Sequence, residues 1–384
     1  MKKSASLFLC SIALLLLCGC ACTAPRNAAA PAVEKKIKTG FYIDLGSRGN
    51  GVLELARLLS YTPQLELRLL TGEDLRKGAL KEIELLVMPG GSSKLQMRSM
   101  APEGVKALRE FVQNGGSYVG ICAGFHITLN RKERAALLPY TYIPEAVGAK
   151  GHVFIDLSPE GADILNVKSG RYRVVYSRGP VAREGAWDKG SCQTLARYKS
   201  SVGPVNRPGK SFFNTPALIC GTFGKGKVIA TSFHPEYDAG TRALLHGCIY
   251  AVTGRKTAPV FPRKNFHPFR VAYYNTAPMT GNNQGAIKDL LALDSSPAIS
   301  VQMGLSEQLL ENVDILYLPD SPAHIWKDLA KGYLAGIMTC FMDNGGRVIA
   351  VGPGWDQMPS HRNLHRVPAG TSPVKAVLET TGAN

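Results

Sequence analysis

The chain has 384 residues, 45% of them hydrophobic and 19% charged, a composition that indicates a folded globular protein and excludes a disordered or fibrous one. The formal net charge is +16. Because the basic residues are scattered and no nucleic-acid-binding motif accompanies them, we expect a solvated basic surface and no nucleic-acid partner.

Residues 1–19 are predicted to be an export signal. Two lysines precede an apolar run at residues 7–17, which is too short to span a bilayer well. The run ends in Leu-Cys-Gly-Cys20, which resembles a bacterial lipobox, so Cys20 is the predicted lipidation site. Cys22 could compete for this role, although a glycine is a poorer match three positions before it. The alternative is an ordinary signal peptide with incidental cysteines.

Residues 20–36 contain many small residues and prolines, as a flexible tether does. A lipid-anchored chain of this kind would lie in the bacterial cell envelope and face the periplasm or the exterior, at the outer membrane in a Gram-negative organism. The N-terminal lipid would be its contact with the membrane, because no second apolar run reaches membrane-spanning length.

From residue 37 onward, apolar runs alternate with helical patterns. Strands are predicted at 37–45, 65–70, 83–88 and 118–121, and helices near 52–60 and from Pro102 to Gly115. Strands that alternate with helices predict an α/β domain with a parallel sheet and helices on both faces.

The next stretch is predicted to be richer in strands. They lie around residues 172–176, 194–198, 217–222 and 227–231, and a Gly224-Lys225-Gly226 turn joins the last two as a hairpin. A helix at 240–253 ends at Gly254. We therefore expect the first domain to span 37–254, followed by a proline-rich, basic linker at 255–268.

Residues 269–384 resemble a second, truncated copy of the first half. Without a gap, Ile83–Pro89 aligns with Val313–Pro319, and Phe111–Gly116 aligns with Phe341–Gly346. A chance match is the alternative, but a strand, a helix and a strand in register favour duplication.

The second copy lacks the residues that could carry chemistry. Gly352 aligns with Cys122, Asp356 with His126, and Asp320-Ser321 with a glycine pair. We therefore expect a degenerate half-domain without a nucleophile. Its Asp314, Asp320 and Trp355 form no recognisable constellation.

The cysteines beyond the signal region predict neither a metal site nor a disulfide framework. They follow no CxxC pattern and do not cluster with histidines at ligand spacing; they are Cys122, Cys192, Cys220, Cys248 and Cys340. The sequence predicts no metal and no cofactor.

Cys122 lies in Gly120-Ile-Cys-Ala-Gly124, between a predicted strand and a helix-like segment, as a nucleophile elbow requires. Such a turn strains the nucleophile's backbone, and the flanking glycines allow other segments to approach closely. A thiol at a helix N-terminus is favoured as the thiolate. The alternative is a buried cysteine at a glycine-rich strand end.

A second motif supplies the partners that a thiol nucleophile needs. In His234-Pro235-Glu236 the imidazole could accept the thiol proton and return it to the leaving amine, while the carboxylate orients the ring. The alternative is a histidine and a glutamate in an ordinary turn.

The turn Pro89-Gly90-Gly91 ends a predicted strand and could direct a backbone N–H at a developing oxyanion, together with the amide of Ala123. Such a site would lie at the carboxyl edge of the parallel strands. The alternative is a simple strand-ending turn.

Taken in order, these three motifs resemble the class I glutamine amidotransferase superfamily, and the Gly115–His126 stretch is most similar to the N-terminal amidotransferase-like domain of some biotin-protein ligases. The resemblance covers about residues 37–254. It implies a flavodoxin-like, doubly wound parallel sheet with a Cys122–His234–Glu236 triad. It does not identify a substrate.

The sequence departs from the superfamily at one important position. Class I enzymes usually carry glutamine where this chain has His126, which puts glutamine binding in doubt. His126 could contact a different substrate or reach the oxyanion region; a packing role is the alternative. With no biotin-ligase catalytic domain and no synthetase domain recognised, biotin ligation is not expected.

Other candidates are weaker. Tyr172, Tyr176 and Arg178 could line the cleft, although a structural role is favoured, and His246 and Cys248 are expected to pack in a helix. We therefore expect a cysteine hydrolase or amidase that acts on a C–N bond of a small-molecule or peptide-like amide. The alternative is a non-catalytic envelope binding protein that keeps the fold. The sequence leaves the oligomeric state open.

Overall fold

The computed structural model describes residues 35–47, 50–185, 192–203, 211–261, 269–276, 284–293, 298–300, 310–330 and 334–382. The predicted signal peptide, the lipidation site Cys20, almost all of the tether and residues 262–268 of the predicted linker lie outside these ranges. Across the described residues, no helix combines the length and the apolar character needed to cross a bilayer.

A nine-stranded sheet forms the centre of the first domain, with strand order β2-β1-β3-β4-β11-β10-β9-β6-β7. Its strands are β1 (Ile37–Tyr42), β2 (Leu65–Leu70), β3 (Leu85–Met88), β4 (Ser117–Ile121), β6 (Lys150–Leu157), β7 (Gly170–Ser177), β9 (Cys192–Tyr198), β10 (Pro216–Phe223) and β11 (Gly226–Thr231). The short strands β5 (Thr141–Tyr142) and β8 (Ala182–Arg183) pair separately.

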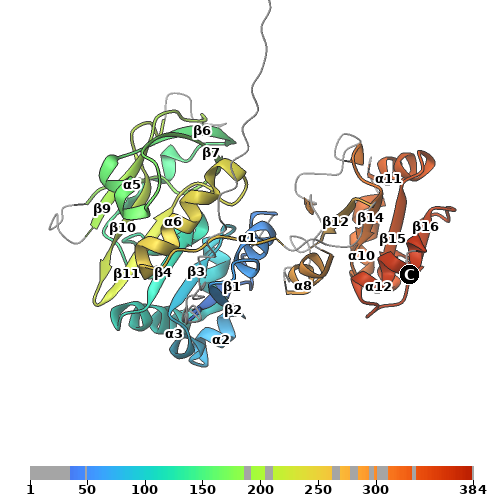
Figure 1. Ribbon diagram of the computed structural model, residues 1–384, viewed down its shortest axis with the longest axis horizontal. Coiled ribbons are helices and arrows are strands. Elements are labelled where there is room, and N and C mark those ends of the chain that lie inside the picture. The colour runs from blue at the N-terminus through green and yellow to red at the C-terminus, as the bar shows by residue number, and fades with distance from the viewer. Residues whose placement is uncertain are drawn as a thin grey trace, which may run out of the picture. The chain divides into compact units, whose positions relative to one another are not determined.

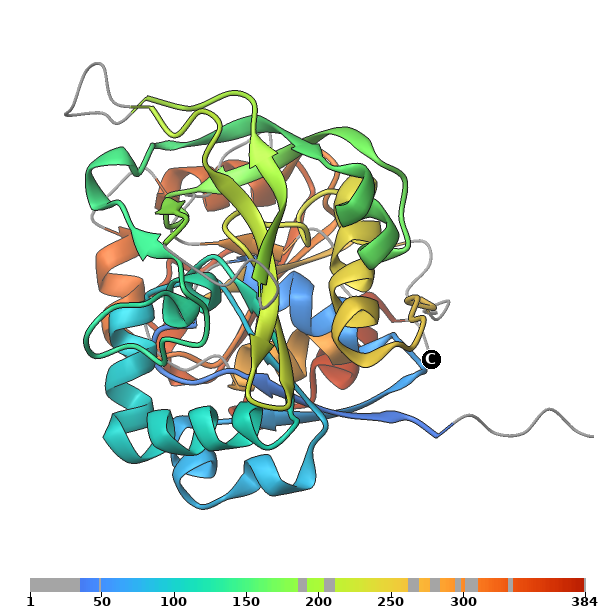
Figure 2. The same ribbon diagram turned by 90° about the vertical axis from the view of Figure 1, so that its left-hand side faces the viewer.

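The main sheet is mixed, so the predicted doubly wound parallel sheet describes only part of it. The first five strands in the sheet order are parallel, which is the flavodoxin-like part that the sequence predicted. The remaining strands are antiparallel, beginning with β10 against β11. A tight turn at Gly224 joins β10 to β11, and such a turn can only reverse the chain. This hairpin, yellow-green, is seen in Figure 2.

Helices cover both faces of the parallel strands. They are α1 (Asn50–Ser60), α2 (Gly72–Arg76), α3 (Ser93–Gln113), α4 (Ala123–Thr128), α5 (Pro159–Leu165) and α6 (Arg242–Thr253), with short 3-10 turns at Ala79–Glu82, Pro144–Ala146 and Ala239–Thr241. Alternate residues of β3 enter opposite cores: Leu85 and Val87 pack in the core that contains α1 and α6, whereas Leu86 and Met88 pack in the core that contains α3. This two-sided burial explains why the strand is continuously apolar.

Helix α3 is bent where the sequence predicts a new helix to begin. Ala101 has non-helical angles (φ 55°, ψ 174°) immediately before Pro102. A proline disfavours the helical conformation of the residue before it, so the second half of α3 starts at Pro102 as expected.

The second half contains a five-stranded parallel sheet with order β13-β12-β14-β15-β16. Its strands are β12 (Val271–Asn275), β13 (Ala298–Ser300), β14 (Ile315–Leu318), β15 (Arg347–Val351) and β16 (Leu364–Val367), and its helices are α8 (Gln284–Leu293), α10 (Ala323–Ala330), α11 (Leu334–Asp343) and α12 (Pro373–Thr381), with a 3-10 turn at Pro353–Trp355. Figure 1 shows strands of this sheet together with these helices. The order corresponds to that of the five parallel strands of the main sheet.

Candidate active site

Cys122 occupies the sharp turn between β4 and α4. Its backbone angles are φ 51° and ψ −97°, a conformation that a residue with a side chain adopts only under constraint. The constraint includes its own N–H, which donates to the carbonyl of Thr231 at 2.8 Å. Cys122 as a whole is 5% exposed. The predicted strand–turn–helix context of the elbow is therefore confirmed.

The glycines on either side of Cys122 are required for close packing. A Cβ added to Gly120 would lie 2.7 Å from the Gly124 carbonyl, and one added to Gly124 would lie 2.3 Å from the Met88 carbonyl oxygen. Real Cβ atoms do not approach backbone so closely, so the sequence can place only glycine at these positions.

His234 and Glu236 form a buried pair after the end of β11. The His234 Nδ1 lies 2.7 Å from Oε1 of Glu236, and the two residues are 6% and 1% exposed. The His234 backbone N–H donates to the carbonyl of Val175 at the end of β7, at 2.9 Å. The second oxygen of Glu236, Oε2, has no hydrogen-bond partner among the described residues.

The turn Pro89-Gly90 brings the nucleophile and the imidazole together. A Cβ on Gly90 would lie 2.7 Å from Cε1 of His234 and 3.5 Å from Cβ of Cys122. The three predicted motifs thus meet where β3, β4 and β11 end, at the carboxyl edge of the parallel strands. On the far side of the triad, a Cβ on Gly51 in α1 would lie 2.5 Å from Oε1 of Glu236.

The environment of His234 favours the imidazolium. Burial acts to lower the pKa of the ring, but the Glu236 carboxylate and the nearby Cys122 side chain together raise it to about 10. An imidazolium beside sulfur stabilises a thiolate, the form of cysteine that attacks carbonyl groups. Because Nδ1 is held by Glu236, Nε2 is the ring nitrogen left for the thiol and the leaving group.

Two features around the elbow are those that an oxyanion site requires. The amide of Ala123 is the first of helix α4 and has no intrahelical partner. Gly91 adopts φ 130°, and the side-chain amide of Gln96 donates to the Pro89 carbonyl at 3.1 Å, which fixes this turn. Gln96 is completely buried and was not anticipated from the sequence.

His126 lies one helical turn after Cys122 and is held as a neutral ring. Its Nδ1 is 2.9 Å from Oγ of Ser93, and the ring packs on Tyr142 with centroids 4.3 Å apart. Burial, assisted by the charges of Arg134 and Arg131, lowers the pKa of His126 to about 4. Its Nε2 is buried and unpartnered among the described residues, so one hydrogen-bonding position remains available.

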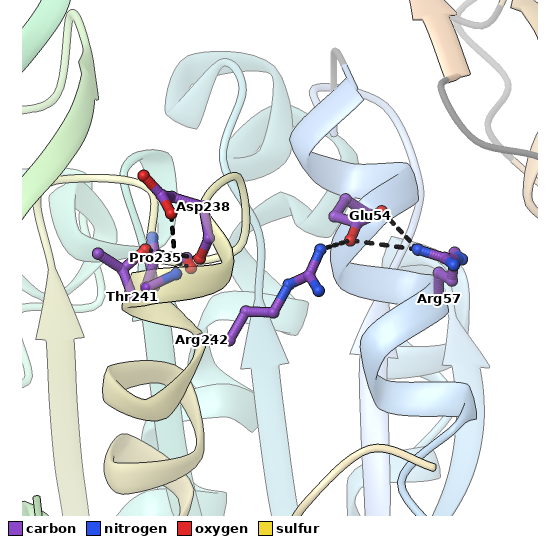
Figure 3. A network of polar contacts seen from close by, with 7 residues as sticks. Glu54, Arg57, Pro235, Asp238, Thr241 and Arg242 are labelled. Atoms are coloured by element: carbon purple, nitrogen blue, oxygen red, sulfur yellow. Dashed lines mark hydrogen bonds and ion pairs between the residues drawn. The ribbon is translucent and has the colours of Figure 1, made fainter. Parts of the chain in front are cut away.

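Polar contacts link the His234–Glu236 segment to the residues that precede α6, and link α6 to α1 (Figure 3). The Thr241 hydroxyl donates to the Pro235 carbonyl at 2.9 Å, inside the motif itself. Next to it, Arg242 at the start of α6 pairs with Glu54 of α1 at 2.7 Å, and Arg57 lies 3.4 Å from the same carboxylate. These contacts fix the segment that carries the imidazole relative to the helix beside Glu236.

The weaker candidates have structural contacts. The buried Tyr176 hydroxyl donates to the Gly179 carbonyl at 2.7 Å, and the Tyr172 hydroxyl donates to the Lys168 carbonyl. His246 is hydrogen-bonded to Thr257, and Cys248 is buried in the core. Asp314 forms an ion pair with Arg270. Arg178 is exposed with φ 55°, next to Ser177, whose carbonyl lies 3.9 Å from the Cys122 sulfur.

The five cysteines from Cys122 onward are free thiols. Within the described ranges, no group of three or more His, Cys, Asp or Glu side chains is arranged to hold a metal ion. In the second half, Trp355 donates to the Pro319 carbonyl at 2.8 Å, whereas Asp320 lines a cavity with Asp289 of α8. That juxtaposition was not predicted, because α8 and the end of β14 are brought together only by packing.

Parts of the chain are similar to known proteins. Residues 51–133 match the family model described as "Biotin-protein ligase, N terminal". A biotin–protein ligase of Schizosaccharomyces pombe is 23% identical over 185 residues, which is 42% of this chain and 27% of that protein. The pyridoxal 5'-phosphate synthase subunit PdxT of Koribacter versatilis is 28% identical over 163 residues, covering 42% of this chain and 73% of that protein.

Among solved structures, PurLQS from Thermotoga maritima is 17% identical and covers 56% of this chain and 98% of its own, with a TM-score of 0.42. The match to the Schizosaccharomyces pombe ligase covers only about a quarter of that protein's length. The matched family region contains the elbow and the Gly90-Gly91 turn, and ends before His234.

Proposed function

We propose that this chain is a cysteine amidase of the bacterial cell envelope. It is an α/β protein whose mixed main sheet is typical of the class I glutamine amidotransferase-like fold, and residues 51–133 match the N-terminal family of biotin-protein ligases. The observation that carries the proposal is the buried His234–Glu236 pair beside Cys122 in its strained elbow. A packing role alone gives no reason to keep a carboxylate, an imidazole and a thiol in contact in a protein interior, where burying ionisable groups is costly.

In the proposed reaction the Cys122 sulfur attacks the carbonyl carbon of an amide, forming a C–S bond and placing the negative charge on the carbonyl oxygen. The Ala123 amide stabilises that oxygen. The His234 imidazolium then protonates the nitrogen as the C–N bond breaks and the amine leaves. Water, deprotonated by the now neutral His234, hydrolyses the thioester to a carboxylic acid and restores the thiol.

The proposed substrate is a peptide-like or cell-wall-derived amide. Support for a substrate other than glutamine comes from His126, which stands where related enzymes usually have glutamine and is held neutral beside Ser93 and Tyr142. No biotin ligase activity is proposed, because the resemblance to ligases is limited to their N-terminal region.

The alternative function is a non-catalytic binding protein, favoured by the same change at His126. Alkylation with iodoacetamide, followed site by site with mass spectrometry, distinguishes the two. We expect Cys122 at pH 6.5 to react at least tenfold faster than Cys192, whose pKa is raised by burial and by Glu184. His234→Ala should remove that advantage, and Cys122→Ala should abolish amide hydrolysis.

Cys192→Ser is the matched control and should leave the reactivity of Cys122 unchanged. Unchanged Cys122 reactivity in His234→Ala would show that imidazole and thiol do not act together, and would favour the binding function.

We also propose lipid attachment at Cys20 and duplication of the α/β half, both on the sequence motifs above. Cys20→Ala should move the protein from the membrane to the soluble fraction, whereas Cys22→Ala should not. Duplication is supported by the equivalent strand orders of the two sheets and by a shared detail: a Cβ on Gly116 or on Gly346 would lie 2.4 Å from the ring of Phe111 or Phe341, respectively.

A further inference from the structure

The second sheet carries a cavity of about 540 Å³ that plays no part in the proposed reaction. It lies beside β12 and β14 and extends to the N-terminus of α12, at the carboxyl edge of the parallel strands. Ligands bind in crevices at that edge in open α/β sheets. Location alone does not indicate a binding site, so the case for a ligand depends on the side chains that line the cavity.

Two carboxylates face this cavity, Asp289 from α8 and Asp320 from the turn after β14. Burial, with a further contribution from the charge of Asp320, raises the pKa of Asp289 to about 6. No lysine or arginine is found among the described residues that line the cavity. The two negative charges therefore share a partly buried space without a counter-charge from those residues.

An independent observation comes from Tyr273. It is completely buried and lines the cavity, and its hydroxyl has no hydrogen-bond partner within the described part of the chain. Buried hydroxyl groups without partners are rare because their desolvation is uncompensated. Its ring is stacked on that of Tyr317 with centroids 5.9 Å apart, so the two aromatic side chains form one wall next to the carboxylates.

We propose that this cavity binds an organic cation, specifically an aliphatic primary amine whose ammonium group pairs with Asp289 and Asp320 and whose carbon chain packs on Tyr273 and Tyr317. The Tyr273 hydroxyl accepts one of the ammonium hydrogen bonds. Tyrosine rings with adjacent carboxylates suit such ligands, because the apolar ring faces also attract positive charge.

A divalent metal fits the described residues less well. Calcium takes about six to eight oxygen ligands, whereas the cavity offers two carboxylates, and no cluster of three or more acidic, histidine or cysteine ligands occurs in the described part of the chain. Magnesium keeps several of its waters and can bind through two carboxylates, but a hydrated ion makes no use of the Tyr273 and Tyr317 rings. The proposal does not depend on catalysis by Cys122, because no residue of the triad lines this cavity.

Isothermal titration of the full-length protein with 1,4-diaminobutane tests the proposal. The neutral analogue 1,4-butanediol controls for shape, and magnesium and calcium chloride test for a metal. We expect the diamine to bind, the diol not to bind, and Asp289→Asn and Asp320→Asn each to weaken diamine binding at least tenfold. The matched control is Glu379→Gln, which removes an exposed carboxylate of α12 outside the cavity and should leave binding unchanged.

Tyr273→Phe keeps the ring and removes only the unpartnered hydroxyl, so it should fold normally and still lose affinity for the diamine. Equal binding of diamine and diol, or no binding of diamine to the folded protein, would overturn the proposal. So would binding of a metal ion that Asp289→Asn abolishes and with which the diamine does not compete. Cys122→Ala should bind the diamine like the wild type, which separates this outcome from the fate of the proposed amidase.

Discussion

At the scale of single residues, Glu236 controls the charge of the ring beside the nucleophile. With the carboxylate present, His234 keeps its proton at neutral pH and loses it only as the pH rises toward its pKa of about 10. In Glu236→Gln the burial of the ring is no longer opposed by that charge, so we expect the pKa of His234 to fall. Side-chain ¹⁵N chemical shifts of histidine, followed between pH 5 and 10, measure the change.

The alkaline limit of amide hydrolysis should move to lower pH in parallel, because the leaving amine requires the imidazolium as its acid. Glu73→Gln is the control, since the exposed Glu73 carboxylate pairs with Lys77 at the end of the same helix, α2. An unchanged ring titration in Glu236→Gln would contradict the electrostatic role given to this residue.

His126 is the residue at which specificity can be tested directly. His126→Gln restores the side chain that related class I enzymes carry, and we expect it to raise hydrolysis of free L-glutamine and to lower hydrolysis of the native amide. The control is His246→Gln, because His246 in α6 is also a buried ring with a pKa lowered to about 4 but is hydrogen-bonded to Thr257. Equal effects of the two substitutions would indicate a packing role for His126.

At the scale of elements, the elbow depends on how closely α4 approaches β3. Gly124→Ala would place a Cβ 2.3 Å from the Met88 carbonyl oxygen, and we expect it to lower the free energy of unfolding by about 1–3 kcal/mol. Gly336→Ala, in helix α11, meets nothing within 4 Å and should be neutral or stabilising by up to about 1 kcal/mol. Thermal unfolding of the two variants should therefore show shifts of different size and sign. A tolerated Gly124→Ala would mean that the elbow can relax.

The elements that the sequence predicted well are those whose pattern is local. Residues 65–70 form a strand with the predicted bounds, and the Gly224 turn forms the predicted hairpin, because burial and turn chemistry are written in adjacent residues. Strand β6 (Lys150–Leu157) was missed although its buried residues alternate regularly, because the exposed Phe154 lies between the buried Val153 and Ile155 and hides the alternation in the sequence. Apart from the Gly224 hairpin, the antiparallel pairing was not predicted, because pairing partners distant in sequence, such as β6 with β9, leave no local signal.

The candidate site could also be predicted only where its residues lie in local sequence motifs. Cys122, His234 and Gly90 lie in short motifs whose spacing is visible in the sequence, and the structure brings them together. Gln96 and Ser93, which support the Gly90 turn and His126, carry no motif and become recognisable only through their contacts.

At the scale of the whole molecule, the turns that follow β4 and β15 hold corresponding places in the two strand orders, and only the first of these turns carries a cysteine. In the second, Gly352 has φ 78° and ψ 172°, a conformation accessible almost only to glycine, and a Cβ there would lie 2.2 Å from Oδ1 of Asp320. In this turn Asp320 fills a space that corresponds to the one that Gly90 leaves open beside Cys122 in the first domain. A cysteine introduced at position 352 should therefore not be enough to form a catalytic site.

Gly352→Cys is therefore expected to destabilise the protein by about 1–3 kcal/mol and to add no reactive thiol. A cysteine-directed electrophile that mimics an amide should still label one residue per chain, Cys122, as counted by intact mass after a short exposure at pH 6.5. Cys340→Ser in the same background removes the native thiol of this half. A second equivalent of rapid labelling would show that the strand-end turn by itself activates a cysteine, and that His234 and Glu236 are not what distinguishes the first elbow.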